Sequence, residues 1–199
     1  PFYRLAFGEA DLLPGLVVDR YGGVLVAQIG TAGMEAMKAE ILDALVKVLA
    51  PEAILWKNDS SIRELEGLER YVETAFGTVP DVVEVPEGGV VFRVPLASGQ
   101  KTGWYFDQAG NRALFARHAK GQRVLDVFSY AGSFGLQAAR AGAAEVTCID
   151  SSASALDAAA ETAAGNGLEA ELLKGDAFDV LEALHADRRR YDLVVIDPP

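Results

Sequence analysis

The stretch from Val124 to Gly135 reads Val-Leu-Asp-Val-Phe-Ser-Tyr-Ala-Gly-Ser-Phe-Gly and decides the fold of this chain. Its apolar first half predicts a buried strand, the glycines at its end predict a turn, and residues 136–140 predict a helix. In an open parallel sheet, the loop after such a strand borders the crevice in which nucleotide-like ligands bind. Asp126 lies inside the apolar run, and its position indicates that the ligand at this loop is more than a phosphate.

Strands and helices alternate from this stretch onward. Such alternation predicts βαβ units with right-handed crossovers and a doubly wound parallel sheet. The expected strands are 123–128, 145–149, 170–173 and 193–196, and the expected helices are 133–141, 152–164 and 177–186. Four strands are few for such a domain and leave an open edge. We therefore expect a domain that is truncated at its C-terminal side.

The first part of the chain has a different pattern, which predicts a small α+β domain. Apolar runs around Gly22-Gly23 and Gly88-Gly89 predict two hairpins. Between them, a helical stripe is expected to pack into the core and to end before Pro51. The stripe consists of Met34, Met37, Ile41, Leu45 and Val48. The expected domains are 1–95 and 96–199.

Composition excludes several classes of protein. The chain has 199 residues, a net charge of −11 and one cysteine. A single cysteine excludes an internal disulfide framework and a multi-cysteine metal site, and no metal is expected. No apolar run approaches the roughly 20 residues of a membrane helix, and no signal pattern opens the sequence. We therefore expect a cytoplasmic protein without membrane contact. The acidic balance argues against nonspecific binding of nucleic acid.

Acidic residues recur at the predicted strand ends, at Asp126, Asp150, Asp176 and Asp197. Because parallel strands end at one edge of the sheet, these carboxylates are expected to converge there. They would repel a phosphate but suit a cationic ligand with hydroxyl groups. An acid after the second strand can bind ribose hydroxyls, and one after the third can reach an exocyclic amine. S-adenosylmethionine has a ribose, an adenine amine, an ammonium and a sulfonium, and is the predicted cofactor.

Two competing interpretations apply to the same residues. A nicotinamide dehydrogenase would carry G-x-G-x-x-G, but Tyr130 occupies the position of the first glycine. Each acid could instead cap a helix N-terminus, and for Asp150 both roles could coexist.

Four motifs give the chain a resemblance to a known family. They are Gly8–Gly22, Gln100–Gln108 with Asn111-Arg112, Asp126–Gly135, and Asp197-Pro-Pro199. With these motifs the chain resembles the class I S-adenosylmethionine-dependent RNA methyltransferases that make 5-methylcytosine in bacterial large-subunit ribosomal RNA. The resemblance covers nearly the whole chain. It implies a Rossmann-like catalytic domain after a central domain associated with RNA recognition. It also implies ribosomal RNA as partner, and it leaves a homodimer open.

The resemblance also implies roles for single residues. Those expected to line the methionine moiety are Phe128, Ser129, Tyr130 and Gly132. Asp150 with Ser151 would hold the ribose, and Asp176 with Ala177 the adenine. Those expected to close over the cofactor or the target are Lys101, Thr102, Gln108 and Arg112. Asp197 and Pro198 would face the base being methylated.

Two parts of the family pattern are missing from this sequence. One is an N-terminal RNA-binding domain, and the other is a nucleophilic cysteine beyond the Asp-Pro-Pro motif. Methylation of cytosine carbon 5 needs a thiolate that adds to carbon 6. Cys148 lies on a predicted strand and is expected to be a buried structural residue. We therefore expect a fragment that binds the cofactor weakly and is inactive alone. The alternatives are methylation of an exocyclic amine such as guanine N2, and a non-catalytic RNA-binding module.

Overall fold

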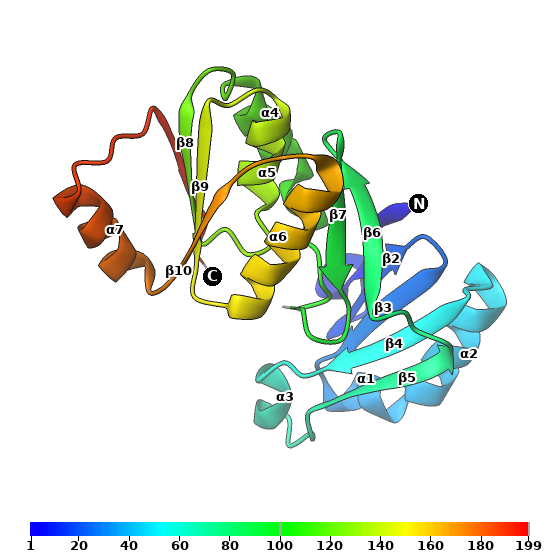
Figure 1. The fold of residues 1–199 in the computed structure, drawn as a ribbon. Helices are drawn as coiled ribbons and strands as arrows, with labels where there is room; N and C mark the ends of the chain where they lie inside the picture. The colour runs from blue at the N-terminus through cyan, green and yellow to red at the C-terminus, as the bar shows by residue number, and fades with distance from the viewer. Residues whose placement is uncertain (100, 199) are drawn as a thin grey trace. The chain divides into compact units, whose positions relative to one another are not determined.

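The computed structural model describes residues 1–99 and 101–198 (Figure 1). Two residues of the sequence motifs, Gln100 and Pro199, lie outside the described part. The fold is α/β, with one mixed sheet, one parallel sheet and a separate hairpin. This confirms the predicted fold class.

The chain divides into two compact units. Unit 1 combines Pro1–Val83 with Pro95–Phe106, and unit 2 combines Glu84–Val94 with the chain from Asp107 onward. The expected division was a single boundary near residue 95. The structure instead groups most of the hairpin before that boundary with unit 2, and the segment after it with unit 1.

The sheet of unit 1 has five strands in the order β1-β2-β3-β4-β5. Neighbouring strands run antiparallel except β3 and β4, which are parallel because two helices return the chain between them. The strands are β1 Phe2–Phe7, β2 Leu16–Tyr21, β3 Val24–Ile29, β4 Ala53–Asn58 and β5 Tyr71–Gly77. The helices are η1 Gly8–Asp11, α1 Ala32–Ala36, α2 Lys38–Leu49 and α3 Ile62–Leu65.

The helical stripe predicted in this unit is only partly correct. Ile41 and Leu45 pack on the sheet against buried residues such as Trp56. Met37 is 51% exposed and Val48 is 78% exposed, so neither belongs to the core. The expected single helix is in fact two, since the chain leaves helical geometry at Met37, with ψ near 12°. This break changes which residues face the sheet.

The sheet of unit 2 is fully parallel, in the order β10-β9-β8-β11. The chain goes from β8 to β9 on one side and returns to β11 on the other, so the order reverses beside β8. Ligands bind at such switch points, outside the carboxyl ends of the strands. The strands are β8 Arg123–Val127, β9 Glu145–Asp150, β10 Glu171–Lys174 and β11 Leu193–Ile196. The helices are α4 Ala109–Arg117, α5 Ser133–Arg140, α6 Ala153–Asn166 and α7 Ala177–Ala186. The short helix η2 Phe106–Gln108 begins at the last residue of unit 1 and continues into unit 2.

Helices cover both faces of this sheet, as the predicted doubly wound fold requires (Figure 1). Val124 and Cys148 pack on the face that carries α4 and α5. Val127 and Ile149 pack on the opposite face with Ala177 and Leu184 of α7. Burial on both faces explains why these strands read as nearly continuous apolar runs.

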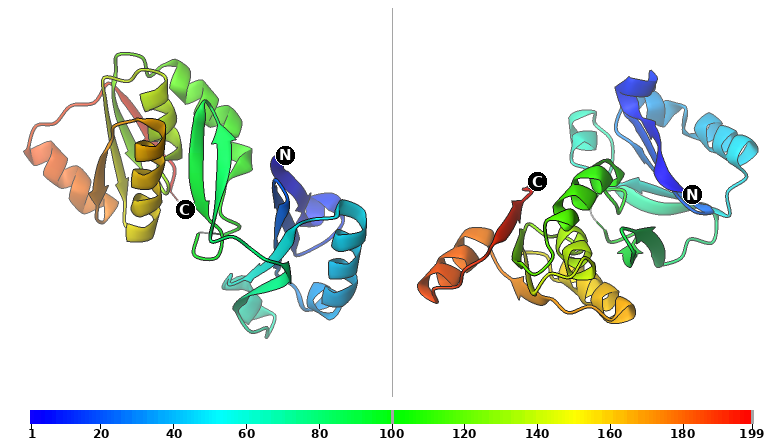
Figure 2. Two further views of the ribbon diagram at one scale, coloured as in Figure 1. Left: turned by 45° about the vertical axis from the view of Figure 1, so that its right-hand side comes forward. Right: turned by 90° about the horizontal axis from the view of Figure 1, so that it is seen from above.

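The hairpin of β6 (Val82–Glu87) and β7 (Val90–Pro95) is fastened to the helices of unit 2. The Glu87 carboxylate accepts two hydrogen bonds from Arg112 on α4, at 2.6 and 2.9 Å, and one from Gln137 on α5 at 2.7 Å. On α6, the Asn166 amide pairs with both backbone groups of Val91. In Figure 2 the hairpin lies beside the helices of unit 2. These contacts explain why the hairpin belongs to unit 2.

Candidate cofactor site

The loop between β8 and α5 is conformationally strained. Phe128 has φ 62° and Tyr130 has φ 49°, a left-handed conformation that residues with side chains seldom adopt. Gly132 has φ 71°, which costs a glycine little. Two such residues on either side of Ser129 cost about 1–3 kcal/mol each, and strain of this kind concentrates at functional sites.

The hydroxyl of Ser129 is the second sign of a ligand at this loop. The residue is 4% exposed, and its Oγ has no hydrogen-bond partner among the described residues. A buried polar group without a partner costs about 1–3 kcal/mol. A bound ligand with a polar group at this position would remove that cost, so the loop fits a polar molecule such as the predicted cofactor.

Asp150 ends β9 and ties the loop to the next helix. Its Oδ2 accepts a hydrogen bond from the Tyr130 N–H at 2.8 Å, and its Oδ1 accepts one from the Ser152 N–H at 2.8 Å. Ser152 is the N-cap of α6. Each carboxylate oxygen accepts more than one hydrogen bond. Asp150 can therefore stabilise the loop and still accept hydrogen bonds from two ribose hydroxyls, so the two roles considered for it are compatible.

Asp176, which follows the next strand, β10, caps a helix at a position that suits ligand binding. It is the N-cap of α7, where its Oδ1 accepts hydrogen bonds from Phe178 and Asp179 at 2.9 and 3.4 Å. Ala177 is buried, whereas Phe178 is 77% exposed. An exposed ring beside a strand-end acid offers a stacking surface to a planar base. Phe178 was not predicted as a site residue, although an aromatic residue two positions after a predicted strand-end acid was a usable signal.

Asp126 lies beneath this loop and is 1% exposed. Burial raises its pKa from the ordinary 3.8 to about 7, and the carboxylates of Asp197 and Asp150 contribute to the increase. The N–H of Gly135, which donates to Oδ2 at 2.8 Å, acts in the opposite direction. The mutual influence of these carboxylates shows that Asp126, Asp150 and Asp197 lie near one another at one edge of the sheet, as expected.

Gly135 packs directly against the side chain of Cys148. A β-carbon at Gly135 would lie 2.6 Å from the Cys148 sulfur and 3.3 Å from Asp126 Oδ2, so only glycine fits there. Cys148 is fully buried, and burial raises the pKa of its thiol well above the ordinary 9.0. A protonated thiol without access to a substrate is no nucleophile. The expectation of a structural cysteine is confirmed.

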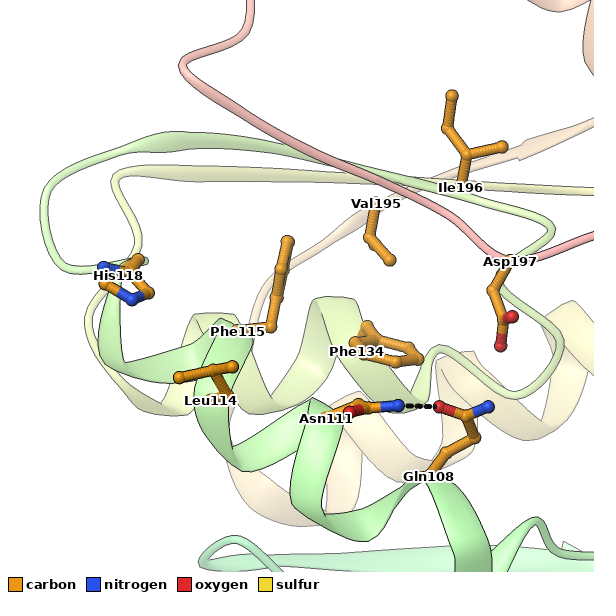
Figure 3. A pocket seen from close by; sticks show the side chains of 9 residues that line it. All are labelled: Gln108, Asn111, Leu114, Phe115, His118, Phe134, Val195, Ile196 and Asp197. Atoms are coloured by element: carbon orange, nitrogen blue, oxygen red, sulfur yellow. Dashed lines mark hydrogen bonds between the residues drawn. The ribbon is translucent and has the colours of Figure 1, made fainter.

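A hollow of about 440 Å³ lies between α4 and β11 (Figure 3). Its lining residues are Gln108, Asn111, Leu114, Phe115, His118, Phe134, Val195, Ile196 and Asp197. The side chains of Asp197 and Gln108 lie at one end, and His118 lies at the other (Figure 3). Gln108 Oε1 accepts a hydrogen bond from Asn111 at 2.7 Å, and its amide nitrogen points away from Asn111, at the end that holds Asp197 (Figure 3). This end offers one donor and one acceptor to a ligand.

Four other predicted site residues lie apart from this loop and hollow in the contacts described. Thr102 and Lys101 belong to unit 1. Thr102 is 1% exposed and donates its hydroxyl to Asp19. The Arg112 guanidinium is bound by Glu87 within unit 2, so it holds α4 to the hairpin. Pro198 is exposed at the end of the described chain, next to Asp197.

Over residues 1–99 and 101–198, no helix is long and apolar enough to cross a membrane. In the same range, no cluster of three or more histidine, cysteine or acidic side chains is arranged to hold a metal ion.

Two bacterial proteins named ribosomal RNA large subunit methyltransferase I are similar in sequence to nearly the whole chain. The protein from Tolumonas auensis is 38% identical over 202 residues, and that from Aeromonas hydrophila is 39% identical over 203. Each alignment covers 99% of this chain and 51% of the relative. The chain thus spans about half the length of these relatives.

Solved structures agree with this likeness. A Streptococcus mutans protein described as a SAM-dependent methyltransferase superposes with a TM-score of 0.87 at 25% identity, covering 100% of this chain and 52% of that one. A methyltransferase complexed with S-adenosylhomocysteine gives the same TM-score and identity, covering 51% of that chain.

The model of the S-adenosylmethionine-dependent methyltransferase family matches residues 22–199, which include the strained loop, Asp150 and Asp197. S-adenosylmethionine is the cofactor of that family, and the unpartnered Ser129 hydroxyl and the converging acids fit its polar and cationic groups. The chain belongs to the S-adenosylmethionine-dependent methyltransferase family.

Proposed function

We propose that this chain carries the cofactor-binding part of an enzyme that methylates large-subunit ribosomal RNA at carbon 5 of cytosine. The observation that carries the proposal is the β8–α5 loop, where a buried hydroxyl without a partner lies between two left-handed residues. The likeness to relatives named for large-subunit ribosomal RNA supports the choice of substrate.

In the proposed complex, each part of the cofactor has its own group of residues. Phe128, Ser129, Tyr130 and Gly132 line the methionine moiety, Asp150 with Ser151 binds the ribose, and Asp176 with Ala177 binds the adenine. S-adenosylmethionine supplies a methyl group activated by a sulfonium. The nearby carboxylates favour such a cation electrostatically.

Asp197 and Pro198 are proposed to face the target base. The Asp197 carboxylate accepts a hydrogen bond from an exocyclic amine, and Gln108 at the same end of the hollow donates one to a ring nitrogen or carbonyl. Fixing the base in this way contributes through proximity and orientation. A base stacked inside an RNA duplex could not enter the hollow, so the target base is single-stranded or flipped out.

The cytosine reaction needs a thiolate that this sequence does not supply, because its one cysteine is sealed against Gly135. We therefore propose that the chain alone binds the cofactor without methylating cytosine, and that the thiolate comes from a residue outside these 199. The same observation favours a second candidate, methylation of an exocyclic amine such as guanine N2. That reaction would use Asp197 as hydrogen-bond acceptor and needs no thiolate.

Calorimetry with S-adenosylhomocysteine tests the cofactor site. We expect the parent chain to bind, Asp150→Asn to bind more weakly, and Asp150→Ala to bind more weakly still. Asp157→Ala is the matched control, because Asp157 is an exposed acid on α6. Absence of binding by the parent, or equal losses in Asp150→Ala and Asp157→Ala, would sink the cofactor assignment.

The reaction is tested with radiolabelled S-adenosylmethionine, unmodified bacterial large-subunit ribosomal RNA and analysis of the digested nucleosides. No transfer by the chain alone is the expected result. Appearance of N2-methylguanosine would select the second candidate, and appearance of 5-methylcytidine would contradict the requirement for an external thiolate.

A further inference from the structure

The segment Pro95–Phe106 of unit 1 is anchored through Thr102. The Thr102 hydroxyl donates to Asp19 Oδ2, and its carbonyl accepts a hydrogen bond from the Tyr21 hydroxyl at 3.1 Å. Asp19 is fully buried and is also bound by Arg4 at 2.9 and 3.0 Å. The backbone at Thr102 is therefore fixed to the sheet of unit 1 on two sides.

Contacts on either side of Thr102 hold the rest of the segment. Before it, the buried Lys57 donates to the Ala97 carbonyl at 2.9 Å. After it, Trp104 is 2% exposed, and the ring of Phe106 lies 5.3 Å from that of Tyr21. A segment held at both ends and in the middle can present a side chain in a defined position.

Lys101 is the side chain presented in this way. It is exposed, and its Nζ lies 5.0 Å from the centroid of the Tyr105 ring. Its φ is 47°, a left-handed value that is uncommon for a residue with a β-carbon. Conformations of this kind persist where the surrounding structure holds them, and they concentrate where a residue serves a ligand.

Lys101 also differs from most other cations of unit 1 in its charge environment. Five of them pair with carboxylates, and Arg20 donates to a carbonyl. The pairs are Arg4–Asp19, Lys38–Glu73, Lys57–Asp59, Arg63–Glu35 and Arg70–Glu64. Among the described residues of unit 1, this leaves Lys47 and Lys101 as the two basic side chains that pair with neither a carboxylate nor a carbonyl. Lys47 lies on the exposed side of α2, without an anchored loop around it.

We propose that Lys101 binds an oxyanion of the methylation substrate, a phosphate of the RNA backbone. The inference rests on the proposed function, since it assumes an RNA substrate. A fixed, unpaired ammonium in an acidic chain is the type of group that positions a nucleic acid through its phosphates. The carboxylate of the cofactor shares this oxyanion chemistry, and a parallel titration with S-adenosylhomocysteine distinguishes the two sources.

Fluorescence anisotropy with a fluorescein-labelled single-stranded RNA, titrated over a range of salt concentrations, tests the proposal. Loss of one phosphate contact reduces the slope of log K against log salt by about 0.7 for single strands. We expect this reduction for Lys101→Met, together with roughly threefold weaker binding at low salt. Lys101→Arg should keep the parent slope, because it keeps the charge.

Lys47→Met is the matched control, since it removes the same charge from an exposed, unpaired lysine of the same unit. Equal slopes for Lys47→Met and Lys101→Met would overturn the proposal, as would absence of RNA binding by the parent chain. Weaker S-adenosylhomocysteine binding by Lys101→Met with an unchanged RNA slope would assign the lysine to the cofactor carboxylate instead. Cofactor binding by the parent and by the Asp150 variants is measured separately. A failure of the proposed cofactor site is therefore distinguishable from a failure of the proposed role of Lys101.

Discussion

Replacement of Asp126 by asparagine should stabilise unit 2 at neutral and alkaline pH. The folded-state pKa of Asp126 is about 7, against an ordinary 3.8, because the carboxylate is buried close to Asp197 and Asp150. The folded state therefore binds the proton more tightly than the unfolded state does. The stability from this group is complete below about pH 4 and is lost as the pH rises through 7.

The pKa difference sets the expected magnitude. An increase of about three units corresponds to about 4 kcal/mol at 1.36 kcal/mol per unit, as an upper value. Asparagine keeps an oxygen that can accept the Gly135 N–H bond and carries no charge at any pH. Asp126→Asn should thus match the parent below about pH 4, exceed its free energy of unfolding by about 1–2 kcal/mol near pH 5, and exceed it by about 2–4 kcal/mol at pH 8.

The assay must follow unit 2 by itself, because two compact units need not unfold together. Hydrogen exchange of the amides in Val124–Gly135 reports on unit 2, with parent and variant compared at the same pH. Both tryptophans, Trp56 and Trp104, belong to unit 1, so urea unfolding followed by their fluorescence serves as an internal control. A stability difference that is the same at pH 5 and pH 8, or a variant less stable at pH 8, would refute the reasoning.

Two further substitutions test the packing around the site. Gly135→Ala places a β-carbon 2.6 Å from the Cys148 sulfur, so we expect it to lower the free energy of unfolding by about 1–3 kcal/mol, measured by heat or urea. The double variant with Cys148→Ala should recover part of this loss, and full stability of the single variant would contradict the reasoning. Glu87→Gln leaves the nearly buried Arg112 without its carboxylate and should cost about 2–4 kcal/mol, with faster hydrogen exchange in β6 and β7. Unchanged exchange in the hairpin would mean that the ion pair does not hold it.

The parallel sheet could be predicted from sequence because its signals are local. Apolar runs alternate with helical stretches, and Gly132 lies where the first strand turns into a helix. That the β6–β7 hairpin belongs to unit 2 could not be predicted in the same way. It depends on Glu87 meeting Arg112, 25 residues later, and on Val91 pairing with Asn166, 75 residues later. Because each polar or charged residue has many possible partners in the sequence, the sequence alone does not indicate which two of them pair.

The helix break at Met37 shows a related limit. Met34, Ile41 and Leu45 follow a helical period, and nothing nearby in the sequence marks an interruption. The chain nevertheless leaves helical geometry at Met37 and restarts at Lys38. Periodicity predicted the existence of the helix better than its continuity.

The acids at the strand ends show why a choice between capping and ligand binding was too narrow. Asp126, Asp150 and Asp176 each accept backbone N–H bonds at the start of a helix or loop, and those bonds fix where their carboxylates lie. A carboxylate held by backbone donors is pre-organised for a ligand, since little further ordering is needed on binding. Removal of Asp150 or Asp176 must therefore lower both stability and affinity. Comparison of asparagine with alanine separates the effects, because asparagine keeps one acceptor oxygen for the backbone while it loses the charge that attracts a cationic cofactor.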